Sequence, residues 1–426
     1  MIMANKNDDY IWHPFTQMKT ANSAIHIERG KNCTLFAADG KEYIDAISSW
    51  WVNIHGHCNE YIANAIAAQA KILEHVIFAG FTHTPAIEIS KKLISILPDH
   101  FAKVFFSDDG STSVEVALKM AIQYWHNQGF KNKTTIIAFE NGYHGDTFGA
   151  MSVAERNAFN AAFNPFLFDV KRLPIPNKNN IASIKQQLII WAEEGNTAAF
   201  IFEPLVQGAA GMLMYEAAYL DELIGIANKK NIICIADEVM TGFGRTGKNF
   251  AINYLQNQPD IICLSKGITG GFMPLGVTVS SQKIYDAFYD DDVKKTFFHG
   301  HSYTANPLAC AAANASMELL MNEKCQYQIK LIAEYHSAFA ADIKNNSFVK
   351  EVRQMGTILA IELNTTEESS YFNAVKKSAY EYYLSRGVFL RPLGNVVYIM
   401  PPYCITKEEL EKVYTVITDS LSMLSA

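Results

Sequence analysis

Two stretches of the sequence, IICIADEV at residues 232–239 and IICLSKG at residues 261–267, decide the fold that we predict. Each begins with an uninterrupted apolar run, and the runs end in Asp237 and in Ser265-Lys266. Continuous apolar character is typical of strands covered on both faces, as in a parallel sheet between helices. Because ligands bind beyond the carboxyl ends of such strands, we expect Asp237 and Lys266 to lie at one site.

More apolar runs of strand length surround these two. The predicted strands are residues 102–106, 135–139, 198–202, 232–236, 261–264 and 276–279. Helix-like stretches lie between them, such as Val114 to Asn127, where the apolar side chains fall on one side. Strands alternating with helices predict an α/β fold with a mostly parallel sheet in a helix sandwich.

The two ends of the chain differ from this middle. A hairpin is expected around Asp39-Gly40. From about Asn322 the sequence predicts in turn a helix, a strand (356–362), a helix (370–386), two strands (388–391 and 396–400) and a last helix after Thr406. We therefore predict a large domain over residues 60–321 and a smaller α+β domain formed by residues 1–59 plus 322–426.

Composition narrows the class of protein. The 426 residues carry a net charge of −7 with no basic run, which argues against nucleic acid as a partner. The seven cysteines are odd in number and none forms a Cys-x-x-Cys pair, which favours reduced thiols over disulfides or a zinc site. Met1 to Tyr10 contains no apolar stretch of signal-peptide length, and no segment approaches about 18 apolar residues. We expect a soluble, cytoplasmic protein with no membrane partner.

Residues after two further predicted strands offer groups for a ligand. Gly110 and Ser111 follow residues 102–106 at the start of a helix, where free N–H groups attract an anion such as phosphate. An ordinary helix cap is the alternative. Tyr143 follows residues 135–139 and has a ring that can stack on a planar heterocycle, although simple packing also explains it.

Asp237 and Lys266 complete this set. A carboxylate at the end of a buried strand needs a partner, and a protonated pyridine nitrogen is one, while a helix cap or ion pair is the alternative. Lys266, beside Gly267 and Gly270-Gly271, can form a Schiff base with an aldehyde, unless it is an ordinary surface charge. In this order and each just past a strand, the four groups predict a pyridoxal phosphate site.

Three other patterns carry no comparable prediction. Gly242 to Gly247 matches G-x-G-x-x-G, but polar residues follow where an apolar helix should begin, so we reject a dinucleotide site. His55-Gly56-His57 and His299-Gly300-His301 space two imidazoles each, but no carboxylate cluster accompanies them, so we expect loops and no metal.

The sequence resembles the class III, fold type I, pyridoxal phosphate aminotransferases over nearly its whole length. The class signature covers residues 237–239, 242–247, 266–267, 270–271 and 274–276. Further matches indicate the branch of biotin biosynthesis, and they are residues 12–18, 49–51, 55–57, 142–147, 207–212, 391–394 and 400–403.

The resemblance implies a role for each cofactor residue. Gly110 and Ser111 would hold the phosphate, and Tyr143 would stack on the pyridine ring and face the substrate. Asp237 would pair with the ring nitrogen, and Lys266 would carry the cofactor and then move the proton. His301 and Ser302 would reach the phosphate from a neighbouring subunit, which implies a homodimer with composite active sites.

The resemblance also implies the substrate site and the reaction. Trp50 and Trp51 would wall the substrate pocket, Gly300 would lie at its edge, and Arg391 would hold a substrate carboxylate. The implied reaction is ping-pong transamination of 8-amino-7-oxononanoate to 7,8-diaminononanoate.

Two departures from the family pattern leave the amino donor open. Phe15, which the resemblance places among the substrate-binding residues, stands where many members have a tyrosine that contacts both substrates. Gly300-His301-Ser302 replaces the more frequent glycine followed by Pro-Thr. We predict S-adenosylmethionine as donor because Trp50-Trp51 is kept, with lysine as the alternative because some relatives with this phenylalanine are associated with lysine.

Alternatives of other kinds also stay open. A general omega-aminotransferase that uses pyruvate shares the signature. A catalytically silent pyridoxal phosphate carrier or regulatory protein on this fold is a rival of another class, and the intact Lys266, Asp237 and Tyr143 count against it. A metal-dependent hydrolase would use the two His-Gly-His stretches.

Overall fold

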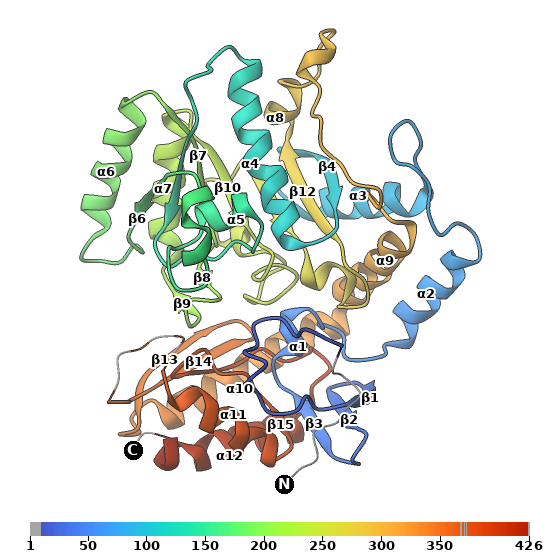
Figure 1. The fold of residues 1–426 in the computed structure, drawn as a ribbon, viewed down its shortest axis with the longest axis vertical. Coiled ribbons are helices and arrows are strands. Elements are labelled where there is room, and N and C mark those ends of the chain that lie inside the picture. Colours follow the sequence, from blue (N-terminus) through green and yellow to red (C-terminus); the bar gives the residue numbers. More distant parts are fainter. Residues whose placement is uncertain (1–9, 367–368, 370, 372, 425–426) are drawn as a thin grey trace.

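The computed structural model describes residues 10–366, 369, 371 and 373–424. Its larger part is built on a seven-stranded sheet with the order β4-β12-β11-β10-β7-β5-β6 (Figure 1). The strands are β4 (Phe101–Ser107), β5 (Thr135–Phe139), β6 (Val170–Leu173), β7 (Thr197–Phe202), β10 (Ile233–Asp237), β11 (Ile261–Leu264) and β12 (Gly276–Ser281). The neighbours from β11 to β6 run parallel, which confirms the mostly parallel sheet.

The predicted strands are found with small changes of boundary. β5 and β11 have the predicted bounds, and the others differ by one or two residues at an end. β12 runs antiparallel to both β11 and β4, which apolar character alone does not indicate. β6 was not predicted because its sequence, Val-Lys-Arg-Leu, is half polar, as suits the edge of a sheet.

Two hydrophobic layers cover the sheet and explain its apolar strands. On β10, Ile233 and Ile235 belong to the cluster that contains the apolar face of α4 (Gly110–Asn127). Cys234 and Ala236 belong to the cluster on the other face. Because successive side chains point to opposite faces, a strand covered on both sides is apolar at every position.

Helices and short elements complete the larger part. α4 packs against β7, β10, β11 and β12, while α7 packs against β10 and α6. The α-helices are α2 (Glu60–Ala70), α3 (Thr84–Ile96), α5 (Phe148–Val153), α6 (Ile181–Glu193), α7 (Ala217–Lys229), α8 (Gln282–Asp286) and α9 (Pro307–Met321). The remaining elements are the hairpin β8 (Val206–Gln207) and β9 (Leu213–Met214), and the 3₁₀ turns η2 (Ala161–Phe166), η3 (Ala251–Tyr254), η4 (Lys266–Thr269) and η5 (Val293–Lys295).

The described N-terminal and C-terminal segments meet in the smaller part, drawn in blue and in orange to red in Figure 1. One sheet joins β1 (Ile27–Lys31), β2 (Thr34–Ala37), β3 (Glu42–Asp45) and β15 (Val388–Phe389), and the other joins β13 (Val349–Met355), β14 (Ile358–Leu363) and β16 (Val396–Ile399). Its helices are α10 (Glu323–Ile343), α11 (Val375–Ser385) and α12 (Lys407–Leu424). The α+β character of this part and the hairpin between β2 and β3 agree with the sequence.

The predicted strands of the smaller part are found with boundaries that differ by at most two residues, whereas α11 and β13 differ more from prediction. α11 begins at Val375, later than predicted, and the Asn373 side chain accepts the N–H of Val375 just before the helix. Ser370, the predicted first residue, lies outside the described residues. β13 was not predicted because charged side chains interrupt its apolar positions. The domain boundaries at residues 59/60 and 321/322 remain a prediction. Residues 1–9, which the prediction assigns to the smaller domain, lie outside the described part. No helix in the described part of the chain is both long and apolar enough to span a membrane.

Candidate active site

A cavity of about 420 Å³ lies at the carboxyl ends of the sheet strands. Six of the residues predicted from the sequence line it, and they are Trp51, Gly110, Ser111, Tyr143, Asp237 and Lys266. They come from five separate segments of the chain. The rule that functional groups follow the strand ends therefore brings the predicted cofactor residues together.

Asp237 forms the buried end of this cavity. Its Oδ2 lies 2.7 Å from Nδ1 of His144, and its Oδ1 accepts a hydrogen bond of 3.1 Å from the backbone N–H of Val239. Burial opposes charge on His144, but the hydrogen bond and the negative charge of Asp237 outweigh it and raise the pKa of His144. The pair holds the Asp237 carboxylate in one orientation, so that its charge faces the cavity.

Glu203, which follows β7, is a second buried acid in the cavity wall. Its carboxylate accepts the backbone N–H of Tyr143 at 3.0 Å and of Gly208 at 2.9 Å. Burial raises its pKa to about 7, and the nearby Asp237 adds to this effect, whereas His144 opposes it. Glu203 thus fixes the backbone on either side of the cavity.

Lys266 lies at the start of η4 with a left-handed backbone, φ 44°. Its Nζ lies 4.7 Å from the ring centroid of Trp51. Burial lowers its pKa to about 8, and Arg245 adds to this, although the charges of Asp237 and Glu203 oppose it. An amine with this pKa is partly neutral near neutral pH, which is the form that acts as a nucleophile or takes up a proton.

The first turn of α4 faces the same cavity. Asp109 caps the helix by accepting the Thr112 N–H at 2.7 Å, and the Ser113 N–H donates to the Asp109 carbonyl at 3.1 Å. The N–H groups of Gly110 and Ser111 remain for an anion, with the helix dipole in their favour. A Cβ on Gly110 would lie 2.7 Å from a methyl group of Val239, so the close approach of these two walls requires glycine.

These donor groups fit pyridoxal phosphate. A buried carboxylate suits a protonated ring nitrogen, an amine of lowered pKa suits an aldehyde, and first-turn N–H groups suit a phosphate. Tyr143 and Val239 provide flat or apolar walls, and about 420 Å³ lies within the usual range for a small-molecule site.

A strained turn holds Trp51 in place. Ser48, Ser49 and Trp51 in the segment labelled α1 (Ser48–Trp51) have φ values between 52° and 67°, which non-glycine residues rarely adopt. The buried Asp45 accepts the N–H of Ser49 at 2.8 Å and its hydroxyl at 2.9 Å. Backbone strain of this kind persists only where the surrounding contacts enforce it, and it gathers at functional sites.

Buried polar contacts fix the other side of Trp51. The fully buried guanidinium of Arg245 donates to the carbonyls of Trp51 at 3.2 Å and of Pro401 at 2.8 Å. The Trp51 indole donates to the Tyr398 hydroxyl at 2.9 Å. Arg245 therefore stabilises the backbone beside Trp51. The stretch from Gly242 to Gly247, which contains Arg245, forms a turn.

Three predicted substrate residues lie beside one another outside the lining of the cavity. The rings of Phe15 and Trp50 are 5.4 Å apart, and the guanidinium of Arg391 lies 4.9 Å from the Trp50 ring centroid. Phe15 and Trp50 are 49% and 41% exposed, so their faces are open to a ligand. Trp50 is adjacent to Trp51, which links this outer group to the cavity.

The three predicted residues at positions 300–302 do not line the cavity of this chain. Gly300 and Ser302 are exposed in the connection between η5 and α9, and His301 is half-buried. The Lys119 ammonium lies 2.9 Å from His299, which places this connection near α4.

The histidine pairs have other partners. His55 lies 2.9 Å from the carbonyl of Ser316, and His57 lies 2.9 Å from Asp45. Among the described residues, no group of three or more His, Cys, Asp or Glu side chains is arranged to hold a metal ion.

His144 and Glu203 were not predicted from the sequence. His144 stands beside the predicted Tyr143, but its partner Asp237 is 93 positions away, so no local pattern pairs them. Glu203 follows its strand just as Asp237 ends its own, so the strand-end rule could have found it.

Comparisons with known proteins identify the family of this chain. The model of the family "Aminotransferase class-III" matches residues 15–421. A relative from Synechococcus elongatus named adenosylmethionine-8-amino-7-oxononanoate aminotransferase is 48% identical, with 97% of this chain and 98% of the relative covered. A Helicobacter pylori relative with the same name is 37% identical, with 98% and 97% covered.

Solved structures give the same result. The Methanocaldococcus jannaschii adenosylmethionine-8-amino-7-oxononanoate aminotransferase superposes with a TM-score of 0.92 at 36% identity, covering 98% of this chain and 97% of that one. A PLP-bound amine transaminase from an uncultivated Pseudomonas species gives a TM-score of 0.90 at 29% identity, covering 97% and 99%. The chain therefore belongs to the class III aminotransferases, which use pyridoxal phosphate as cofactor.

Proposed function

We propose that this aminotransferase converts 8-amino-7-oxononanoate to 7,8-diaminononanoate in biotin biosynthesis, with S-adenosylmethionine as amino donor. The observation that carries the proposal is the position of Arg391 against Trp50, next to the Trp51 that faces Lys266. A long apolar substrate that ends in a carboxylate suits a reacting amine at one end and a guanidinium at the other. The names of the relatives that match nearly the whole chain support the same substrates.

One group of the proposed cofactor residues contacts the ring and aldehyde of the cofactor, and the other group binds its phosphate. Asp237 holds the ring nitrogen, Lys266 holds the aldehyde end, and Tyr143 covers the ring. Gly110 and Ser111 bind the phosphate, together with His301 and Ser302 of a neighbouring subunit. Bound in this way, the cofactor supplies an aldehyde that takes up the substrate amine and a ring that accepts electrons.

Lys266 is the proposed proton carrier. Its Nζ takes a proton from the substrate carbon that bears the amine and later returns one, which requires a neutral amine. The lowered pKa, about 8, keeps part of the population neutral at pH 7 to 8. His144 keeps the Asp237 carboxylate oriented during these steps. Burial raises the pKa of Tyr143, so its hydroxyl stays protonated and can donate to the substrate or, as here, to Asp146 at 3.1 Å.

Lysine is a second candidate donor. Phe15 has no hydroxyl for a polar contact with the donor, and the net value of one such hydrogen bond is about 0.5 to 1.5 kcal/mol. The loss is modest, and the ring still offers a stacking face, so we favour S-adenosylmethionine.

An exposed apolar surface supports the homodimer. Residues 72–83 and 298–306 lie together, since His83 bonds to the carbonyl of Ala305 and His75 contacts the Tyr303 ring. Large exposed side chains on these segments are Ile72, Ile77, Phe81, Phe298 and Tyr303. Large exposed apolar side chains on two adjoining segments are typical of a subunit interface. We propose that this interface brings His301, Ser302 and Gly300 to the active site of the partner subunit.

We also propose that the enzyme has two domains and acts in the cytoplasm.

One assay tests the reaction. Enzyme loaded with pyridoxal phosphate is given 8-amino-7-oxononanoate with S-adenosylmethionine or with lysine, and 7,8-diaminononanoate is measured by mass spectrometry. We expect product with S-adenosylmethionine; product with lysine alone contradicts the donor, and no product with either contradicts the substrate.

A further inference from the structure

A row of four aromatic rings begins at the proposed substrate site and joins two segments of the smaller part of the chain through Phe159 of the larger part. From Trp50 and Phe15, 5.4 Å apart, it continues to Phe159 at 6.4 Å and to Tyr371 at 4.7 Å. The interplanar angles of 56° to 73° give tilted and edge-to-face contacts, which aromatic pairs favour. Phe159 is 43% exposed, close to the values for Phe15 and Trp50, so part of each of these three rings is accessible to solvent.

Phe159 is held in a defined turn. The side chain of the buried Asn160 accepts the N–H of Asn157 at 3.1 Å and donates to the carbonyl of Glu155 at 2.7 Å. The N–H of Phe159 donates to the Asn157 side chain at 2.9 Å. The turn is also tied to the cavity, since the carboxylate of Glu155 accepts the N–H of Asn141 at 2.8 Å, two residues before Tyr143.

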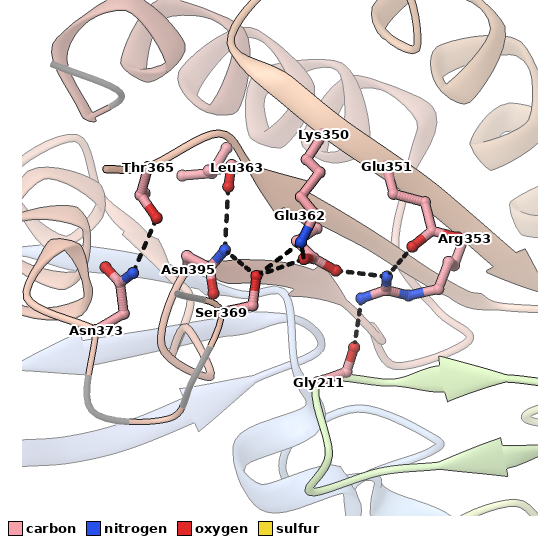
Figure 2. A network of polar contacts seen from close by, with 10 residues as sticks. All are labelled: Gly211, Lys350, Glu351, Arg353, Glu362, Leu363, Thr365, Ser369, Asn373 and Asn395. Atoms are coloured by element: carbon pink, nitrogen blue, oxygen red, sulfur yellow. Dashed lines mark hydrogen bonds and ion pairs between the residues drawn. The ribbon is translucent and has the colours of Figure 1, made fainter. Parts of the chain in front are cut away.

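A polar network at β14 and the start of β16 lies close to Tyr371 in the sequence (Figure 2). Ser369, two residues earlier, donates to Glu362 at 2.6 Å and accepts from the Asn395 side chain at 3.1 Å. Glu362 also pairs with Arg353 at 2.7 Å, and Arg353 reaches the carbonyl of Gly211 at 2.9 Å. Burial opposes the ionisation of Glu362, but hydrogen bonds from Lys350, Ser369 and Arg353 lower its pKa to about 2, so the network stays charged.

A positive charge lies at each end of the row. The Lys376 ammonium is 3.2 Å from the Tyr371 ring centroid, and the Arg391 guanidinium is 4.9 Å from that of Trp50. The row therefore suits a ligand with a planar ring that stacks on phenylalanine and a carboxylate that meets a cation. Of the two donors considered, only S-adenosylmethionine has a planar ring.

We propose that Phe159 is a specificity-determining residue for the amino donor and that Tyr371 positions it, so that the row favours a donor with a planar heteroaromatic ring. This inference rests on the proposed function and assigns a subsite within it. The keto substrate, an aliphatic chain, needs no such ring contact, so the two half-reactions depend on Phe159 differently.

The test measures the two half-reactions separately on the enzyme loaded with cofactor. Phe159→Ala is expected to raise KM for S-adenosylmethionine about tenfold, the effect of losing one stacked ring, with kcat kept. In the same variant, KM for 8-amino-7-oxononanoate is expected to change less than about twofold, because this substrate has no ring to stack. Tyr371→Ala should also raise KM for S-adenosylmethionine, but by less than Phe159→Ala does. Tyr371→Phe, which keeps the ring, should have the KM of wild type. Tyr327→Ala, an exposed tyrosine on α10, is the matched control.

The outcomes distinguish a donor subsite from a purely structural role of the aromatic row. Equal changes in both half-reactions, or a lower melting temperature that accounts for the change, would mean that the row only supports the fold and would overturn the inference. Unchanged kinetics in Phe159→Ala would do the same. If wild type makes no 7,8-diaminononanoate with either donor, the proposed function fails as well, and if it does so with lysine alone, only the donor and this inference fail.

Discussion

The inner and outer halves of the site are built differently. The inner half, with Asp237, Lys266 and Glu203, stands at the ends of central strands, and the two acids have buried hydrogen-bond partners. The outer half, with Phe15, Trp50 and Phe159, stands on loops and is 41% to 49% exposed. Groups that carry out the same chemistry in every member of a family need fixed geometry, whereas groups that select the substrate can vary on loops. We therefore expect changes in the inner half to affect kcat and changes in the outer half to affect KM.

Lys266→Ala should have the largest effect. Without the amine that moves the proton, kcat is expected to fall on the order of a thousandfold. Turnover of both half-reactions is measured, with circular dichroism to show that the fold is kept. Lys248→Ala, an exposed lysine beyond the same signature, serves as control, and a Lys266→Ala enzyme with wild-type turnover would break the distinction between the two halves.

Asp237→Asn should come next. It removes the negative charge at the buried end of the cavity and the ion pair with His144, so kcat is expected to fall on the order of a hundredfold. Steady-state kinetics and binding of the cofactor are compared with those of Asp260→Asn, a buried acid that pairs with Lys283 outside the cavity. A change in KM alone would place Asp237 with the outer half instead.

Arg391→Gln should affect the outer half. A hydrogen bond to a charged group contributes about 1.5 to 3 kcal/mol, so KM for 8-amino-7-oxononanoate is expected to rise by roughly 10- to 100-fold. Because Arg391 lies away from the reacting atoms, kcat should be nearly unchanged. Arg386→Gln, an exposed arginine against the Tyr382 ring, is the matched control. A loss of kcat at saturating substrate would contradict the assignment.

The smallest effect is a dependence on pH. Burial lowers the pKa of Lys266 to about 8, and the neutral amine is the form that reacts with the cofactor aldehyde. The neutral fraction rises as pH rises through this value, so the rate of cofactor loading into the apoenzyme should increase about tenfold between about pH 7 and pH 9. Stopped-flow absorbance measures it, and a rate that still rises tenfold per unit above pH 9 would show an unshifted lysine.

The same contrast explains what the sequence could predict. The apolar runs at residues 135–139 and 261–264 mark strands whose two faces are both buried, so composition alone locates β5 and β11. Strand direction depends on long-range pairing, which is why the antiparallel β12 could not be foreseen. Likewise Asp237 and Lys266 follow from their place at strand ends, whereas the contact of His144 with Asp237 requires the fold.

The outer half was harder to predict from physical pattern. Phe15, Trp50 and Arg391 came from the resemblance alone, since nothing local marks a loop aromatic as part of a site. Phe159 and Tyr371 carry no motif, and their packing joins segments more than 200 positions apart. Backbone strain at Ser48, Ser49 and Trp51 is equally invisible in the sequence, because its cause is the buried Asp45 and the surrounding contacts.

The most direct test of the account is to locate the cofactor on the chain. Borohydride reduction of the loaded enzyme links pyridoxal phosphate permanently to the amine that holds it, and peptide mass spectrometry identifies that residue. We predict that the label lies on Lys266 in wild type and is absent from Lys266→Ala. A label on another lysine, or none on wild type, would contradict the assignment of the inner half of the site.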